Sequence, residues 1–121
     1  MKGQKLAILR NEDVVIVPVQ GDLDDLELES FETSLLQETS KADVKGLILD
    51  VSSVDTIDHF MARKLIRMVK MVSLMDVNSV LVGMKPSVAI TLTDMNESFS
   101  DIKTALNLEK GLAVLRLARE C

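Results

Sequence analysis

Hydrophobic and polar positions change from a strand-like to a helix-like pattern within the first third of the chain. Two short segments rich in Val, Ile and Leu, Lys5–Arg10 and Asp13–Val19, are separated by a two-residue connection. This spacing predicts a β-hairpin or a pair of adjacent strands. Further along, apolar residues recur at helical spacing, at Leu28, Phe31, Leu35 and Leu36. We expect Asp24 or Asp25 to cap this helix, whose first turn is acidic.

The rest of the chain alternates between strand and helix patterns. Gly46–Val51 is a continuous apolar run of strand length, which is typical of a strand covered on both faces. A helical pattern follows Asp58 and extends to Leu74 or Met75. Its apolar stripe is expected to face the core and contains Met61, Leu65, Met68, Val72 and Met75. Further elements are predicted at Asn78–Gly83 (strand), Pro86–Met95 (helix), Lys103–Leu106 (strand) and Glu109–Arg119 (helix).

This alternation predicts a single α/β domain over residues 1–121, with the element order ββαβαβαβα. Strands that alternate with helices favour a sheet with parallel pairs and right-handed crossovers. The N-terminal hairpin adds an antiparallel pair, so we expect a mixed β-sheet with helices packed against it. A chain of 121 residues is long enough to bury a core of this kind.

The charge of the chain excludes several classes of partner. The net charge is −5, and the first 50 residues contain five Lys or Arg against eleven Asp or Glu. We interpret the acidic run between Asp22 and Glu32 as the solvated face and N-terminal turn of the first helix. A nucleic-acid surface needs the opposite charge, and Trp and Tyr, which would stack on bases, are absent. No apolar run approaches the roughly 20 residues of a membrane span. We therefore expect neither a nucleic-acid nor a membrane partner.

Residues that commonly carry catalysis or bind metals are scarce. Cys121 is the single cysteine and His59 the single histidine, too few for a His/Cys metal site, although a carboxylate site for a hard cation stays open. The sequence has no glycine-rich phosphate loop and no G-x-S-x-G turn. We expect no cofactor and no enzymatic activity. The cysteine content, and an N-terminus unlike a signal peptide, predict a reducing cytoplasm.

The most informative segment joins the buried strand to the helix that follows it. Asp58 stands at the N-cap position, where a carboxylate accepts a hydrogen bond from a free backbone N–H group. His59 falls about 160° from the apolar stripe, so it is expected to be exposed, on the same side as Arg63. An anion at residue 59 would meet unpaired N–H groups and the positive end of the helix dipole. We interpret Ser53 and Thr56 as turn residues that hydrogen-bond locally.

Five stretches of the sequence together resemble the STAS domains, the family of anti-sigma factor antagonists, and among them the scaffold proteins of the stressosome. The resemblance covers nearly the whole chain, and its more specific parts are the loop that ends at Asp58 and the segment Gly83–Ala89. The five stretches are Val14–Gln20, Gly21–Asp25, Asp50–Asp58, Val82–Ala89 and Ala105–Leu112.

The resemblance implies a switch without catalysis. In such proteins a kinase phosphorylates the serine directly after the loop aspartate; the unphosphorylated form holds that kinase and the phosphorylated form releases it. In this sequence the position is His59, which has no hydroxyl, so the switch is expected to be absent, altered or moved. Thr91 matches a second phosphorylation position of relatives, although it also fits a residue packed at a helix rim. Arg63 and Arg67 are expected to face the partner.

The resemblance also names the classes of partner. It implies a regulatory serine/threonine kinase of the RsbT type, co-antagonist STAS proteins of the RsbR type, and further copies of the chain in a large complex. Two other functions stay open. His59 could itself accept a phosphoryl group, which would make the protein a phosphocarrier. Alternatively the domain could bind a nucleotide, although the sequence has no glycine cradle for one.

Overall fold

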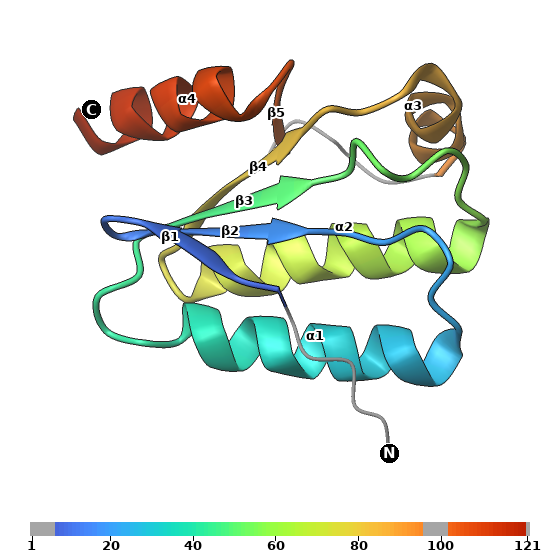
Figure 1. Cartoon of the computed structure of the whole chain (residues 1–121), viewed down its shortest axis with the longest axis horizontal. Helices are drawn as coiled ribbons and strands as arrows, with labels where there is room; N and C mark the ends of the chain where they lie inside the picture. Colours follow the sequence, from blue (N-terminus) through green and yellow to red (C-terminus); the bar gives the residue numbers. More distant parts are fainter. Residues whose placement is uncertain (1–6, 96–101, 121) are drawn as a thin grey trace.

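The computed structural model describes residues 7–95 and 102–120 and contains one five-stranded sheet with helices on both faces (Figure 1). The sheet order is β1-β2-β3-β4-β5, with β1 antiparallel to β2 and the other neighbours parallel. The predicted element order and mixed sheet are confirmed. The elements are β1 (Leu9–Asn11), β2 (Val14–Pro18), α1 (Asp25–Thr39), β3 (Gly46–Asp50), α2 (His59–Leu74), β4 (Asn78–Val82), α3 (Pro86–Thr93), β5 (Lys103–Ala105) and α4 (Leu108–Glu120).

The N-terminal hairpin forms as predicted, with shorter strands. β1 pairs with β2 in a register that sets Leu9 opposite Ile16. The tight connection needs a left-handed backbone at Glu12, whose φ is +56°. The start of the predicted strand, residues 5–6, lies outside the described part of the chain.

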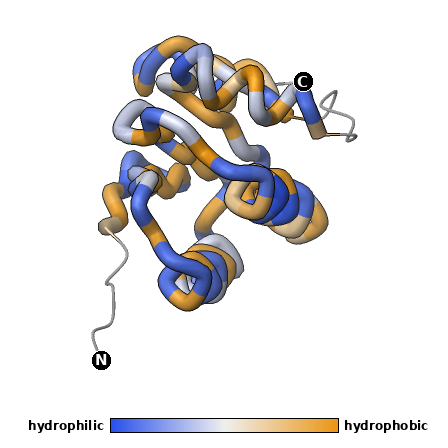
Figure 2. Tube along the Cα trace, turned by 90° about the vertical axis from the view of Figure 1, so that its right-hand side faces the viewer, coloured by the Kyte–Doolittle hydropathy of each residue, from blue (hydrophilic) through white to orange (hydrophobic). Residues whose placement is uncertain are grey.

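Alternate residues of the central strands enter two cores. Side chains such as Val15, Leu47 and Leu49 face α1 and α2, whereas Ile16 and Ile48 face Leu115 of α4 on the other side. β3 is therefore covered on both faces, as its continuous apolar run predicts. Around α1 and α2, which Figure 2 shows nearly end-on, hydrophobic and hydrophilic residues occupy different sides, as expected for helices with one face on a core.

The first helix is capped by Asp24 and not by Asp25. The Glu27 N–H donates to Asp24 Oδ1 at 2.8 Å, and the Asp24 N–H donates back to Glu27 Oε1 at 2.9 Å. This reciprocal capping box satisfies two N–H groups that the helix itself leaves without acceptors.

Glu32 contradicts the prediction that the whole acidic run is solvated. It lies on the side of α1 that meets α2 and is 8% exposed. Its two carboxylate oxygens accept from Lys64 Nζ and Arg67 Nε, each at 3.1 Å. A carboxylate is buried at low cost only when cations and hydrogen bonds replace water, and α2 supplies both.

Two predicted apolar positions near helix ends also differ. Met75 was expected on the buried stripe of the second long helix, but it is the C-cap residue of α2 and is 37% exposed. The chain leaves the helix there, because Asp76 adopts a left-handed backbone with φ +64°. α3 ends at Thr93, earlier than predicted, although Met95 still packs against the core.

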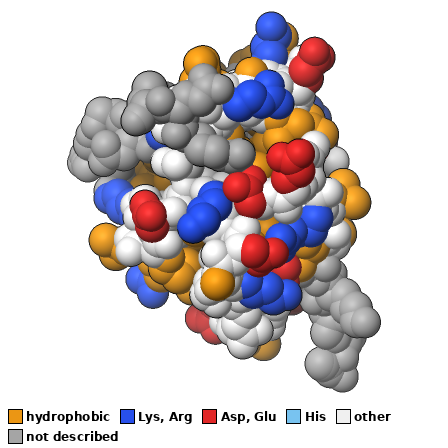
Figure 3. All heavy atoms as spheres, turned by 90° about the vertical axis from the view of Figure 1, so that its left-hand side faces the viewer, with side chains coloured by type: hydrophobic (Ala, Val, Ile, Leu, Met, Phe, Trp, Pro, Cys, Tyr) orange, Lys and Arg blue, Asp and Glu red, His pale blue; other side chains and the backbone are white. Residues whose placement is uncertain are grey.

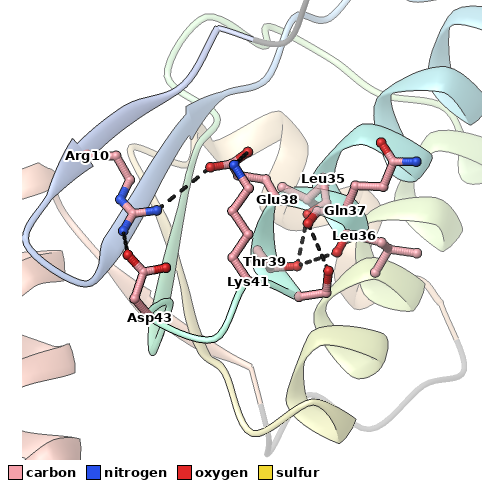
Figure 4. Close-up of polar contacts among 9 residues, drawn as sticks. Arg10, Leu35, Leu36, Gln37, Glu38, Thr39, Lys41 and Asp43 are labelled. Carbon is pink, nitrogen blue, oxygen red and sulfur yellow. Dashed lines mark hydrogen bonds and ion pairs between the residues drawn. The ribbon is translucent and has the colours of Figure 1, made fainter.

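Ion pairs connect the hairpin to the last turn of α1 and to the loop that follows it (Figure 4). Arg10 Nη2 lies 2.6 Å from Asp43 Oδ2 and Arg10 Nη1 lies 3.7 Å from Glu38 Oε2, while Lys41 pairs with Glu38 at 3.0 Å. The hydrogen bond from Arg10 lowers the pKa of Asp43. Basic and acidic side chains are mixed over this end of the molecule (Figure 3), which lies opposite the loop that contains Asp58.

Candidate functional site

The loop between β3 and α2 lies at the edge of the sheet where the parallel strands end. The N-termini of α1, α2 and α3 all lie at this edge (Figures 1 and 2). Parallel strands that alternate with helices place the connections after each strand on one side. Residues 51–58, α3 and the beginning of α2 are therefore brought together although they are distant in sequence.

The loop is anchored in the core by two buried valines and contains a hydrogen-bonded turn. Val51 and Val54 are fully buried, and the Val54 N–H donates to the Val51 carbonyl at 3.0 Å. Asp50 Oδ1 accepts from the Ser52 N–H at 3.0 Å. The predicted turn residues Ser53 and Thr56 are exposed. The local turn bond that sequence reasoning assigned to hydroxyls is thus made by the Asp50 carboxylate.

Gly83 allows β4 and the loop to approach each other closely. Its φ is +76°, and a Cβ added there would lie 2.8 Å from Ser52 Cβ. A side chain would strain the backbone and also collide with the loop. The glycine of the Gly83–Ala89 segment therefore has a steric reason in this fold.

Asp58 is the N-cap of α2, as predicted. Its Oδ1 accepts from the Met61 N–H at 2.8 Å, and its carbonyl accepts from the Ala62 N–H at 3.0 Å. His59 is the first residue of the helix and its side chain is exposed, and Arg63 is exposed one turn later. Residue 59 is thus presented to solvent at the positive end of the α2 dipole.

Three residues of α3 and its N-cap form hydrogen bonds with the loop. Lys85 Nζ donates to Asp55 Oδ1, and Ser87 Oγ donates to the Asp55 carbonyl. The hydrogen bond from Lys85 lowers the pKa of the exposed Asp55 carboxyl. Thr91 Oγ1 lies 3.2 Å from the Ser87 carbonyl and 3.5 Å from the Ile57 carbonyl.

Of the residues of α3 and its N-cap that contact the loop, the sequence identified Thr91 but not Lys85 or Ser87. Thr91 is half-buried at the rim of α3, and its hydroxyl contacts the loop two residues before His59. The two candidate phosphorylation positions are therefore close in the fold. Lys85 and Ser87 were not recognised as site residues; the only signal was their place in the segment that resembles the STAS family. Their contacts with Asp55 span 30 and 32 residues of sequence, and no local periodicity encodes such contacts.

The two arginines predicted to face a partner have different surroundings. Both Arg63 and Arg67 are exposed, as the angular pattern of the helix predicts. Arg67 also binds Glu32, so it helps to join α1 to α2. Its guanidinium is therefore held in place by an intramolecular partner, and this role was missed because Glu32 was interpreted as solvated.

The described residues, 7–95 and 102–120, offer little for metal chemistry or membrane insertion. Within them, no three His, Cys, Asp or Glu side chains form a group that could hold a metal ion. None of the helices in this part of the chain has both the length and the apolar character needed to cross a bilayer.

Comparison with known proteins gives consistent results. Residues 5–111 match the STAS domain family. The RsbT co-antagonist proteins RsbRD and RsbRB of Bacillus subtilis are 26% and 28% identical over 102 and 105 residues, which are 84% and 87% of this chain. Those matches cover only 37% and 38% of the two relatives, so this chain spans little more than a third of their length.

Solved structures agree over the full fold. A serine-to-glutamate variant of RsbS from Moorella thermoacetica superimposes with a TM-score of 0.87 and 35% identity, covering 98% of this chain and 100% of that one. A chain from the solved structure of the stressosome, described as a signal integration and transduction hub, superimposes with a TM-score of 0.82 and 37% identity. The match covers 95% of this chain and 100% of that one. The match over residues 5–111 and the likeness to RsbS lead to one conclusion: the chain belongs to the STAS domain family and is an RsbS-like member of it.

Proposed function

We propose that this protein is a non-enzymatic anti-sigma factor antagonist, a cytoplasmic scaffold of the stressosome type that holds a regulatory serine/threonine kinase at the N-terminus of α2. The observation that supports this most is the presentation of residue 59. His59 is exposed directly after the Asp58 cap, at the end of a loop that Lys85 and Ser87 contact through Asp55 and that Gly83 approaches closely. An exposed helix end that is capped and supported by loop contacts suits recognition by another protein, because such contacts lower the ordering entropy lost on binding.

The names of the relatives suggest the partners. The curated relatives are co-antagonists of RsbT, and one of the similar structures is that of the stressosome. By analogy, the kinase would be RsbT-like, and the protein would assemble with RsbR-like co-antagonists and with further copies of itself. These partners are proposals for this chain, because it spans only part of the curated relatives.

His59 changes the expected regulation at this site. A serine/threonine kinase transfers phosphate to a hydroxyl, and the imidazole has none. The protein would therefore stay in the kinase-holding state with respect to residue 59, and release would need another route. Thr91 is the proposed second position. Its hydroxyl now faces the Ser87 and Ile57 carbonyls, so phosphorylation there would require it to leave these contacts and would place new negative charge beside the loop.

The test is capture of an RsbT-like kinase by the purified protein, measured by calorimetry. We expect His59→Ala to keep binding and His59→Glu, which places a negative charge where a phosphoserine would stand, to weaken it at least tenfold. Gln37→Glu is the matched control, because it adds the same charge at an exposed position near the C-terminal end of α1. That end lies on the opposite side of the molecule from the N-terminus of α2 (Figure 1). No capture by the native protein, or equal losses for the two glutamate variants, would contradict the proposal.

The phosphocarrier alternative uses the same exposed imidazole. His59 lies at a helix N-terminus, where a phosphoryl group would be stabilised by backbone N–H groups. Incubation with a phosphohistidine donor separates the two functions. An acid-labile adduct on His59 supports the carrier, whereas an unmodified histidine in a protein that captures the kinase supports the scaffold.

A further inference from the structure

The outer face of α2 is a cationic surface on an acidic protein. Between His59 and Leu74 the helix contains Arg63, Lys64, Arg67 and Lys70 and no Asp or Glu, although the net charge of the chain is −5. Glu32 neutralises part of this charge from the buried side, where it binds Lys64 and Arg67. Arg63 is exposed to solvent on this face. The face therefore attracts negative charge.

The same face has a groove with apolar walls. The groove has a volume of about 400 Å³ and runs along the helix from Phe60 to Leu74. Phe60 is 39% exposed and Leu74 is 86% exposed, while Ile66 and Met71 form part of the lining between them. Exposed apolar side chains in a row with cations at their edge mark an interaction surface. The occupant must supply an apolar anchor flanked by carboxylates.

The beginning of α1 is a segment with this chemistry. Leu26 is 77% exposed in the first turn of the helix. Asp24, Asp25 and Glu29 are exposed around it. Leu26 does not reach the groove of its own molecule, since α1 packs beside α2 through Glu32 and leaves Leu26 in solvent. The donor segment and the groove can therefore meet only between two molecules.

We propose that the α2 groove binds the first turns of α1 from a second copy of this chain, with Leu26 in the groove and the carboxylates of Asp25 and Glu29 against the cationic face at Arg63. This inference deepens the self-association proposed above by naming the two surfaces that meet. The donor and the acceptor are different surfaces, so the contact is heterologous. A dimer formed in this way keeps one free donor on one molecule and one free groove on the other, which allows assemblies larger than a dimer.

The test is sedimentation velocity over a range of protein concentrations, at low and at high salt. The native protein is expected to self-associate and to dissociate as salt rises, because screening weakens exposed charge pairs. Leu26→Lys removes the donor, and Arg63→Glu alters the groove. Each variant alone should associate at least tenfold more weakly. Leu106→Lys is the control, since Leu106 is also exposed (73%) but lies in neither surface. Circular dichroism checks that every variant is folded.

Mixing the two variants gives the decisive result. Leu26→Lys keeps an intact groove and Arg63→Glu keeps an intact donor, so an equimolar mixture should form a complex of twice the chain mass although each variant alone stays monomeric. A native protein that is monomeric at every concentration, single variants that associate like the native protein, or a mixture that remains monomeric would overturn the proposal. Kinase capture is measured separately on His59 variants, so failure of the kinase proposal and failure of this one are distinguishable.

Discussion

The hydroxyl of Thr91 in α3 lies 3.5 Å from the carbonyl of Ile57, at the end of the loop that leads into α2. This contact joins the two positions that the STAS resemblance singles out, Thr91 and residue 59. The same hydroxyl lies 3.2 Å from the Ser87 carbonyl in its own helix. α3 is therefore part of the support for the α2 N-terminus and does not merely lie next to it.

Replacing the Thr91 hydroxyl should loosen this support. We expect Thr91→Val to lower the free energy of unfolding by about 0.5–1.5 kcal/mol, the usual contribution of one hydrogen bond. Backbone amide exchange at residues 57–61 should also become faster. Thr93→Val is the control, because the Thr93 hydroxyl is exposed and bonds only to Ala89 and Ile90 of its own helix. Equal amide exchange in both variants would show that the contact with Ile57 contributes nothing.

Gly83→Ala should destabilise the protein more than an ordinary surface substitution. The added Cβ would meet Ser52 Cβ at 2.8 Å, and a φ of +76° is unfavourable for alanine. We expect a loss of about 1–3 kcal/mol in urea unfolding. Gly21→Ala is the control, since a Cβ there would lie 3.4 Å from its nearest neighbour, the Val54 Cα. The double variant Gly83→Ala/Ser52→Gly should recover the part of the loss that comes from the collision and retain the part that comes from φ.

The Asp55–Lys85 contact should give stability that depends on pH. The pKa of Asp55 is lowered from its ordinary value of 3.8, so the folded state binds a proton there less readily than the unfolded state. The contact therefore stabilises the fold above pH 3.8, and its contribution is lost as the pH falls through the lower pKa of the folded state. In urea titrations the midpoints of native protein and Asp55→Asn should differ near neutral pH and converge in acid. The difference should be small because Asp55 is exposed.

The order of elements could be predicted from the sequence because each element carries its own local signal. A continuous apolar run identifies β3, a stripe at helical spacing identifies α2, and Asp58 stands where the stripe begins. The exposure of His59 also follows from helix geometry alone. Local pattern thus specifies both the strand-to-helix connection and the direction in which residue 59 points.

The contacts that give the site its shape could not be predicted in this way. Glu32 stands one turn after Leu28 on the apolar stripe of α1, so helical spacing indicates its burial. Its cationic partners Lys64 and Arg67 lie 32 and 35 residues further along the chain, and no local pattern indicates those contacts. Lys85 meets Asp55 because β3 and β4 are parallel neighbours whose connections leave the same edge of the sheet. Both arrangements depend on pairings between elements more than 25 residues apart.

His59→Ser should restore phosphorylation by a cognate RsbT-like kinase. The new hydroxyl would lie at the first position of α2, where the product phosphate is stabilised by free N–H groups and by the helix dipole. The loop contacts from Asp55 and Thr91 do not involve the side chain of residue 59, so the variant should fold like the native protein. We expect mass spectrometry to find one phosphate on the new serine, and kinase capture to weaken once it is added.

His59→Ala and Thr56→Ser are the controls for that experiment. His59→Ala changes the same position without adding a hydroxyl, so it should gain no phosphate. Thr56→Ser leaves a hydroxyl on an exposed loop residue three positions earlier, outside the helix N-terminus. Phosphate on residue 56 instead of residue 59, or an unmodified serine at position 59 in a variant that still binds the kinase, would contradict the assignment of residue 59. Binding without phosphorylation would mean that the loop docks the kinase with residue 59 directed away from the transferred phosphate.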